Sequence, residues 1–235
     1  MAETPEQRER TSALIDLALH DLRNPIASIQ LNVQLVGQEP ALPADVAEAL
    51  DDVQAAVGAL QRLLANLADL LRATHAELPA RALPTSAASL FGDVQHALES
   101  RATPRRQRVE LEVPGDLPQL LVDPELLQRV LVTLGGDSLS CTPAGGRITL
   151  GARATQRGVE LRLTDDGPKI PEAQRARVLE LDYQLEGRVA GDPRAGRGFG
   201  LAFCQAAARA QGGRLWVEDA PGRGACWCLE LPAVP

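Results

Sequence analysis

A histidine followed by a short series of polar residues lies near the start of the chain, and these residue types suit nucleophilic chemistry. His20 is followed directly by Asp21, and Asn24 comes four residues later. An imidazole nitrogen is a nucleophile, a carboxylate accepts its ring proton, and an amide one helical turn away orients a water or a phosphoryl oxygen. A histidine on the flank of a helix is by itself an ordinary surface residue. Pro25, however, costs about 3 kcal/mol inside a helix and predicts a bend there, which favours a functional site.

Two long helices must position this site, and the apolar residues predict both of them. Apolar residues alternate steps of four and three from Ile15 to Val36, and a second series of this kind runs from Val46 to Leu71. This is the heptad pattern of helices that pack lengthwise. The segment EPALPAD between the two series contains two prolines, which end the first helix. The sequence therefore predicts an antiparallel helical hairpin with His20 on its flank.

The apolar face of this hairpin is wider than one partner helix can cover, because Leu14, Leu63 and Leu70 extend it. A second hairpin would cover the surplus and form a four-helix bundle in a two-fold dimer. The alternative is that the surplus face packs against the rest of the same chain. We expect the homodimer.

Composition and charge exclude several classes of protein. The 235 residues include no run of 18 apolar residues and no signal-peptide pattern, so we expect a cytoplasmic protein without a membrane span. A net charge of -7 argues against nucleic acid as a partner. We interpret the basic run Arg101, Arg105, Arg106 and Arg108 as a solvated loop. The four cysteines lack paired CxxC spacing and are interpreted as buried thiols.

A second domain is predicted after the hairpin. Residues 74–88 contain two prolines and lose the heptad, which indicates a linker. Beyond it, helical patterns alternate with β-like runs, so we expect one sheet covered by helices. The predicted α+β organisation is a helical hairpin over 1–76, a linker over 77–87 and an α/β sandwich over 88–235.

The stretch His20-Asp21-Leu22-Arg23-Asn24-Pro25 resembles the H-box of the dimerisation and histidine-phosphotransfer domains of two-component sensor kinases. The usual form of that box is H-E/D-L-R-T/N-P. The resemblance implies that His20 takes a phosphoryl group, that Asp21 is the general base, and that Asn24 assists hydrolysis of a partner's phospho-aspartate. It also implies that the partner is the receiver domain of a response regulator.

Residues 85–233 resemble the catalytic ATP-binding domain of the same kinases, the GHKL or Bergerat fold. The sequence TDDGPKIP at 164–171 is similar to the G1 box, and GRGFGL at 196–201 is similar to the G2 box. The resemblance implies that Asp165 accepts a hydrogen bond from the adenine amino group and that Gly167, two residues later, belongs to the same nucleotide site. It further implies that three G2 glycines bring backbone N–H groups to the phosphates. These glycines are Gly196, Gly198 and Gly200.

The N-box of this domain departs from the family pattern NxxxNAxKYTPxGG, because residues 133–146 read TLGGDSLSCTPAGG. Asp137 replaces the magnesium-binding asparagine, Ser140 the lysine, and Cys141 the aromatic residue. An aspartate can still bind Mg²⁺. Loss of the lysine removes a charge interaction worth up to about 4 kcal/mol at 4 Å and an effective dielectric of 20, so we expect affinity for ATP to fall.

Three further residues depart from an ordinary helix or from the G1 pattern. Gly135 and Gly136 lie inside the predicted N-box helix, where each costs about 1 kcal/mol relative to alanine. Lys169 replaces the second glycine of G1. If that position needs positive φ, the lysine strains the turn or fills the pocket; alternatively, Lys169 restores the lost positive charge.

The phosphoryl-accepting half therefore keeps its motif, whereas the ATP-using half has lost part of its own. The sequence predicts a dimeric, histidine-kinase-like protein that exchanges a phosphoryl group between His20 and a receiver aspartate. ATP-dependent autophosphorylation, with ATP and Mg²⁺ as ligands, is expected to be weak or lost. We expect no sensor domain before the first helix and input from a separate sensor protein. Three alternatives stay open: an active ATP-dependent kinase, a pseudokinase that only binds a regulator, and a phosphatase that depends on Asn24.

Overall fold

The computed structural model describes residues 5–39, 42–75, 78, 80–180, 183, 199–220, 222 and 224–234. The chain divides into two compact units, Met1–Glu77 and Leu78–Pro235. No helix among the described residues is long and apolar enough to cross a membrane.

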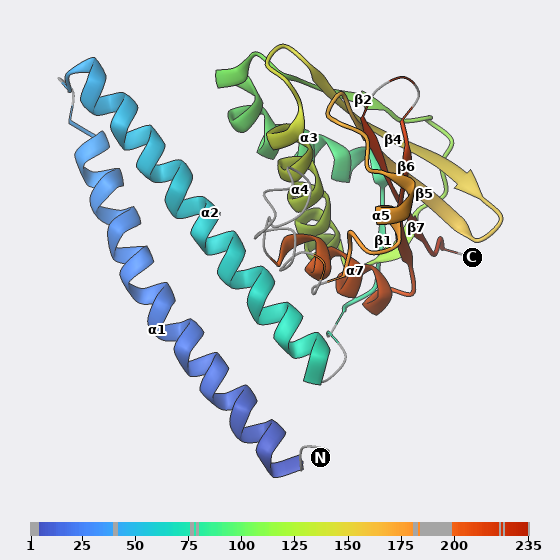
Figure 1. Ribbon diagram of the computed structural model, residues 1–235, viewed down its shortest axis with the longest axis horizontal. Helices are drawn as coiled ribbons and strands as arrows, with labels where there is room; N and C mark the ends of the chain where they lie inside the picture. Colours follow the sequence, from blue (N-terminus) through green and yellow to red (C-terminus); the bar gives the residue numbers. More distant parts are fainter. Residues whose placement is uncertain are drawn as a thin grey trace. The chain divides into compact units, whose positions relative to one another are not determined.

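The first unit is a hairpin of two long helices, α1 (Pro5–Gly37) and α2 (Ala44–His75), which run antiparallel along each other (Figure 1). Every seventh residue of α1 is buried, at Leu19, Ile26 and Val33. A hydrogen bond of 2.7 Å from Gln61 Nε2 to Gln30 Oε1 also joins the helices. Because α1 continues through Pro25 as one helix, the bend expected there stays a prediction.

Six other heptad positions of the hairpin are exposed in the single chain. In both helices these positions alternate with the inward-facing ones; they are Leu22, Ile29 and Val36 in α1, and Val46, Val53 and Leu60 in α2. Leu63 is exposed, as expected for a surplus apolar face, whereas Leu70 is buried. The side chain of Leu14 lies outside the described part of the chain. The other described heptad residues of α2 are half-buried, except Val57, which is buried; the half-buried ones are Leu50, Leu64, Leu67 and Leu71. One hairpin therefore leaves a large part of its heptad surface uncovered.

The second unit is built on a five-stranded sheet with the order β2-β4-β5-β7-β6. Strands β2 and β4 are parallel, and the other neighbours are antiparallel. The strands are β2 (Arg108–Glu112), β4 (Arg147–Thr155), β5 (Gly158–Asp165), β6 (Arg214–Asp219) and β7 (Ala225–Leu231). Two short strands, β1 (Leu83–Thr85) and β3 (Leu120–Val122), form a separate antiparallel pair.

Three helices pack against one face of this sheet and close the core (Figure 1). They are α3 (Ala87–Ala102), α4 (Pro124–Cys141) and α7 (Gly200–Ala210); the short helices η1 (Thr103–Arg105) and α5 (Glu172–Arg175) lie in connections. Ser86 and Asp123 cap α3 and α4 by accepting a hydrogen bond from the backbone N–H three residues on. The prediction of a helical region followed by a mixed α/β domain is confirmed.

Close packing between α3 and α4 explains the two glycines inside the N-box helix. A Cβ atom at Gly135 would collide with Cδ1 of Leu98, which is fully buried. A Cβ atom at Gly136 would collide with Nη1 of Arg101 and lie 2.9 Å from its Cζ. The glycines therefore offset their helix-propensity cost by letting α3 lie directly against α4.

The cysteines are free thiols, in line with their interpretation from the sequence. Cys204, Cys226 and Cys228 are buried and Cys141 is half-buried. Cys226 and Cys228 lie on the same side of β7 with their sulfur atoms 3.6 Å apart.

Candidate functional sites

The predicted phosphoryl-accepting residues lie together on one turn of α1. His20, Asp21, Asn24 and Pro25 are all exposed, directly after the buried Leu19. The Ser28 hydroxyl donates a hydrogen bond to the backbone carbonyl of Asn24 at 3.1 Å, and this bond does not involve the imidazole. The imidazole is therefore accessible to a reacting group in the single chain.

Sequence reasoning missed an apolar surface on the same side of α1. Leu17, Leu31 and Leu35 are 58%, 57% and 55% exposed. At about 100° per residue, all three point within about 60° of the direction of His20. We call the surface formed by Leu17, His20, Asn24, Leu31 and Leu35 the His20 stripe. Its leucines are outside the heptad, and this departure was the available signal.

In the second unit, Asp165 lies at the end of β5 and is buried. Ser138 of α4 donates its hydroxyl to Asp165 Oδ2 at 2.9 Å. The backbone N–H groups of Gly167 and Ala225 donate to Oδ1 at 2.9 and 3.3 Å. Three donors from three parts of the chain thus orient this carboxylate, so its position is set by the fold.

Gly224 brings the start of β7 directly against Asp165. Its φ is +93°, and a Cβ atom there would collide with the backbone carbonyl of Asp165. Both the backbone angle and the close approach require glycine. This contact explains how the N–H of the next residue, Ala225, reaches the Asp165 carboxylate.

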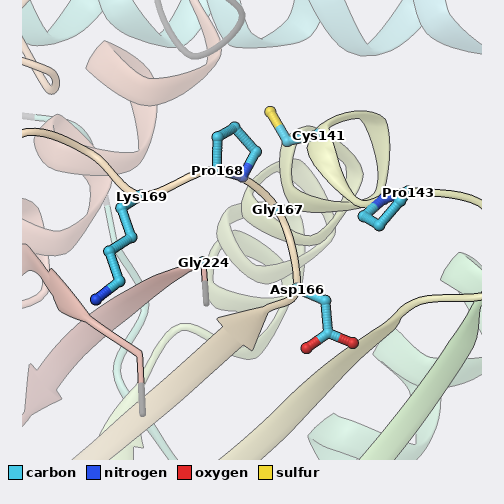
Figure 2. A pocket seen from close by; sticks show the side chains of 7 residues that line it. All are labelled: Cys141, Pro143, Asp166, Gly167, Pro168, Lys169 and Gly224. Carbon is cyan, nitrogen blue, oxygen red and sulfur yellow. The ribbon is translucent and has the colours of Figure 1, made fainter. Parts of the chain in front are cut away.

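A cavity of about 510 Å³ lies beside Asp165, between the G1 turn and the C-terminal end of α4 (Figure 2). Its lining residues are Cys141, Pro143, Asp166, Gly167, Pro168, Lys169 and Gly224. Volumes of about 300–1,000 Å³ are typical of sites for small molecules. Cys141, at the position of the family's aromatic residue, lies next to Pro168 in Figure 2. The cavity is thus at the place where the resemblance puts the adenine base.

Lys169 neither strains the G1 turn nor fills this cavity. Among the described residues other than glycine, only Arg106 has a positive φ. Lys169 is exposed, and its side chain extends away from Cys141 and Pro168 (Figure 2). The condition for strain at Lys169, a positive φ, is therefore not met, because the turn does not use the left-handed conformation at this position.

Asp137, the candidate magnesium ligand, is half-buried on α4 and adjoins the first residue of α7. A Cβ atom at Gly200 would lie 3.8 Å from Asp137 Oδ2. The described residues contain no group of three or more His, Cys, Asp or Glu side chains placed to hold a metal ion. Mg²⁺ is usually bound by one or two carboxylates together with phosphate oxygens, so a single carboxylate here fits that ion. Gly196 and Gly198 lie outside the described residues.

The C-terminal end of α4 is held by residues from the basic run. Arg105 Nη1 donates to the Leu139 carbonyl at 3.2 Å. Gln107 Nε2 donates to the carbonyls of Leu139 and Thr142 at 2.9 and 2.7 Å. These contacts satisfy carbonyls that a helix end leaves without a partner. The four arginines of the run are exposed, as interpreted from the sequence, but Arg101 lies in α3 and Arg105 in η1 rather than in a loop. Arg101 also packs on Gly136.

The two units together define a class of protein: a helical hairpin that exposes a histidine, followed by an α/β sandwich with a nucleotide-sized cavity. Two family models match them. Residues 11–76 match the His Kinase A (phospho-acceptor) domain. Residues 122–235 match the histidine kinase-, DNA gyrase B- and HSP90-like ATPase. The chain belongs to the two-component sensor histidine kinase family.

Curated relatives are similar along the whole chain. The adaptive-response sensory kinase SasA of a Nostoc species is 32% identical over 240 residues, which cover 98% of this chain and 59% of that protein. SasA of Synechococcus elongatus is 29% identical, covering 98% and 61%. The chain spans about three-fifths of the length of these relatives.

Solved structures share the fold. Full-length ShkA in complex with AMPPNP has a TM-score of 0.71 at 24% identity, covering 99% of this chain and 46% of ShkA. Histidine kinase ThkA in complex with the response regulator protein TrrA has a TM-score of 0.62 at 18% identity, covering 97% and 64%. At these identities the likeness concerns the fold alone.

Proposed function

We propose that this chain is a phosphotransfer protein of two-component signalling that carries a phosphoryl group on His20 and exchanges it with a receiver aspartate. The observation that carries the proposal is the exposed imidazole of His20, with Asp21 and Asn24 exposed on the same helical turn. Membership of the histidine kinase family supports it.

The reaction needs few groups from the chain. One ring nitrogen of His20 attacks the phosphorus of the receiver's aspartyl phosphate, and the bond between phosphorus and the aspartate oxygen breaks. The receiver carboxylate leaves with the electron pair of that bond. The proton on the other ring nitrogen passes to Asp21, whose carboxylate is the nearest base along the chain. In the opposite direction the same groups return the phosphoryl group to the receiver.

The His20 stripe supplies the docking surface for the receiver in this proposal. Leu31 and Leu35 lie about three and four turns after His20 at 3.6 residues per turn, on the same side of α1. Exposed leucines in line with a reactive group favour a protein partner over a small molecule. A receiver that covers these residues would bring its aspartate to the imidazole.

The exposed heptad residues of both helices support a homodimer as the working form. At about 100° per residue, Leu22, Ile29 and Val36 of α1 lie about 60° around the helix from the buried positions and on the side opposite the His20 stripe. We expect Ile29→Glu to lower the dimer fraction, because it places a charge in the interface. Leu31→Glu is the matched control: it should stay dimeric but accept phosphoryl groups from the receiver more slowly. Light scattering coupled to size-exclusion chromatography measures the first effect, and a monomeric wild type would contradict the dimer.

ATP-dependent autophosphorylation of His20 is the second candidate function. The sequence predicts that it is weak or lost, and the geometry of the nucleotide site supports weak activity over complete loss. The Asp165 carboxylate is oriented, the cavity beside it is open, and Lys169 leaves the turn unstrained. Mg²⁺, held through Asp137, would supply positive charge to the phosphates. We propose weak rather than absent ATP use, because Ser140 and Cys141 lack the family's lysine and aromatic ring.

Labelling of the purified chain tests both functions. Wild type, His20→Ala and His96→Ala are each incubated with phosphorylated receiver domains and, separately, with radiolabelled ATP and Mg²⁺. His96 is a matched control because it is an exposed histidine of α3. We expect acid-labile label on wild type and His96→Ala and none on His20→Ala. Label that persists in His20→Ala would contradict the role of His20. If wild type is labelled in the ATP incubation but not in the incubation with phosphorylated receiver, the result would favour the kinase over the phosphorelay.

A further inference from the structure

Arg101 of α3 packs against α4 at Gly136, next to the candidate magnesium ligand. Its guanidinium occupies the space that a Cβ atom at Gly136 would need. The Arg101 side chain as a whole stays exposed, and its guanidinium lies within electrostatic reach of the Asp137 carboxylate. Any side chain larger than that of glycine at position 136 would displace this arginine. The surface of α4 at Gly136 therefore has room for one cation beside Asp137.

This cation position at Gly136 coincides with the place where the family's N-box lysine would put its charge. Ser140 follows Gly136 by four residues, so both lie on the same side of α4. The Ser140 hydroxyl donates to the Gly136 carbonyl at 2.8 Å, which confirms that the two residues are stacked. Long side chains on a helix point back toward its N-terminus, over the residue four positions earlier. A lysine at position 140 would thus carry its ammonium group over residue 136, where Arg101 now lies.

We propose that Arg101, on α3, supplies the positive charge that binds the polyphosphate of a nucleoside di- or triphosphate. In the family pattern this charge comes from the lysine at position 140, on the helix that corresponds to α4. Gly136 makes room for the guanidinium, because a Cβ atom at this position would collide with it. The inference rests on the proposed binding of nucleotide in the second unit and assigns a residue to its phosphate end. It also gives the glycine at 136 and the serine at 140 one physical reason.

Calorimetric titrations with ATP, ADP and adenosine test this assignment. Removing one phosphate-facing charge should weaken ATP and ADP binding about tenfold in Arg101→Ala, a loss equal to about 1.4 kcal/mol. Adenosine has no phosphate, so its affinity should not change. The double variant Arg101→Ala/Ser140→Lys should regain wild-type ATP affinity to within about threefold, because the lysine would return the positive charge to the same position. Thermal melting of each variant checks that it is folded.

Two single variants act as controls for charge and position. Arg157→Ala removes an exposed arginine at the turn between β4 and β5. That turn is at the opposite end of β5 from Asp165, about 23 Å away along the strand. Arg157→Ala should leave ATP affinity unchanged. Lys169→Ala removes the rival cation in the cavity lining and should weaken ATP binding less than Arg101→Ala.

Four results would overturn the assignment. They are unchanged ATP affinity in Arg101→Ala, an equal loss of adenosine and ATP affinity, a larger phosphate-dependent loss in Lys169→Ala, and no rescue by Ser140→Lys. A wild type that binds no nucleotide would also overturn it. In that case the proposed exchange between His20 and the receiver is still tested separately, by the labelling experiment with phosphorylated receiver domains.

Discussion

The two candidate sites of this molecule are built in opposite ways. His20, Asp21 and Asn24 are exposed on one turn of one helix. Asp165 is buried and receives hydrogen bonds from α4, from the G1 turn and from the start of β7. The first site is made by local sequence, whereas the second requires the packed domain. Substitutions should therefore separate chemistry from stability in the hairpin but not around Asp165.

The largest effect is expected where β7 meets Asp165. Gly224→Ala should lower the free energy of unfolding of the second unit by at least about 3 kcal/mol, because it adds a left-handed non-glycine residue and a backbone collision. Nucleotide binding should be lost with it. Gly222→Ala is the matched control: φ is +95°, but the space around it is open, so about 1 kcal/mol is expected. Urea denaturation measures both, and equal losses would show that contact with Asp165 is unimportant.

A medium effect is expected at the contact between α3 and α4. Gly135→Ala should destabilise the second unit by a net of about 1 kcal/mol or more, because collision with the buried Leu98 outweighs the gain in helix propensity. Gly92→Ala makes the same change on the exposed side of α3, where no atom lies within 4 Å. It should stabilise by about 0.5–1 kcal/mol. Two changes of the same sign in thermal melting would contradict the close packing.

The sequence predicts the hairpin site more completely than the site around Asp165. The hairpin needed only heptads and one local motif, and the strand expected at Val159–Thr164 is β5, Gly158–Asp165. The motifs indicate Asp165 and Gly200, but they give no relation between the unusual residues of the N-box and the rest of the domain. The pairing of Gly136 with Arg101 cannot be predicted, because 35 residues separate them and their contact exists only after α3 packs on α4. The charge pattern likewise could not indicate that Arg105 binds the end of α4.

The smallest effect on stability is expected in the hairpin, where it accompanies a large effect on chemistry. Asn24→Ala should change the free energy of unfolding by no more than about 0.5 kcal/mol, because the Asn24 side chain is exposed and alanine favours a helix. Dephosphorylation of the cognate receiver should nevertheless slow by about a hundredfold or more if the amide orients the attacking water. Asn32→Ala makes the same substitution at an exposed position of α1 outside the His20 stripe and should alter neither quantity. A stability loss in Asn24→Ala comparable to that of Gly135→Ala would mean that this turn, like the region around Asp165, depends on packing, and the contrast between the two sites would fail.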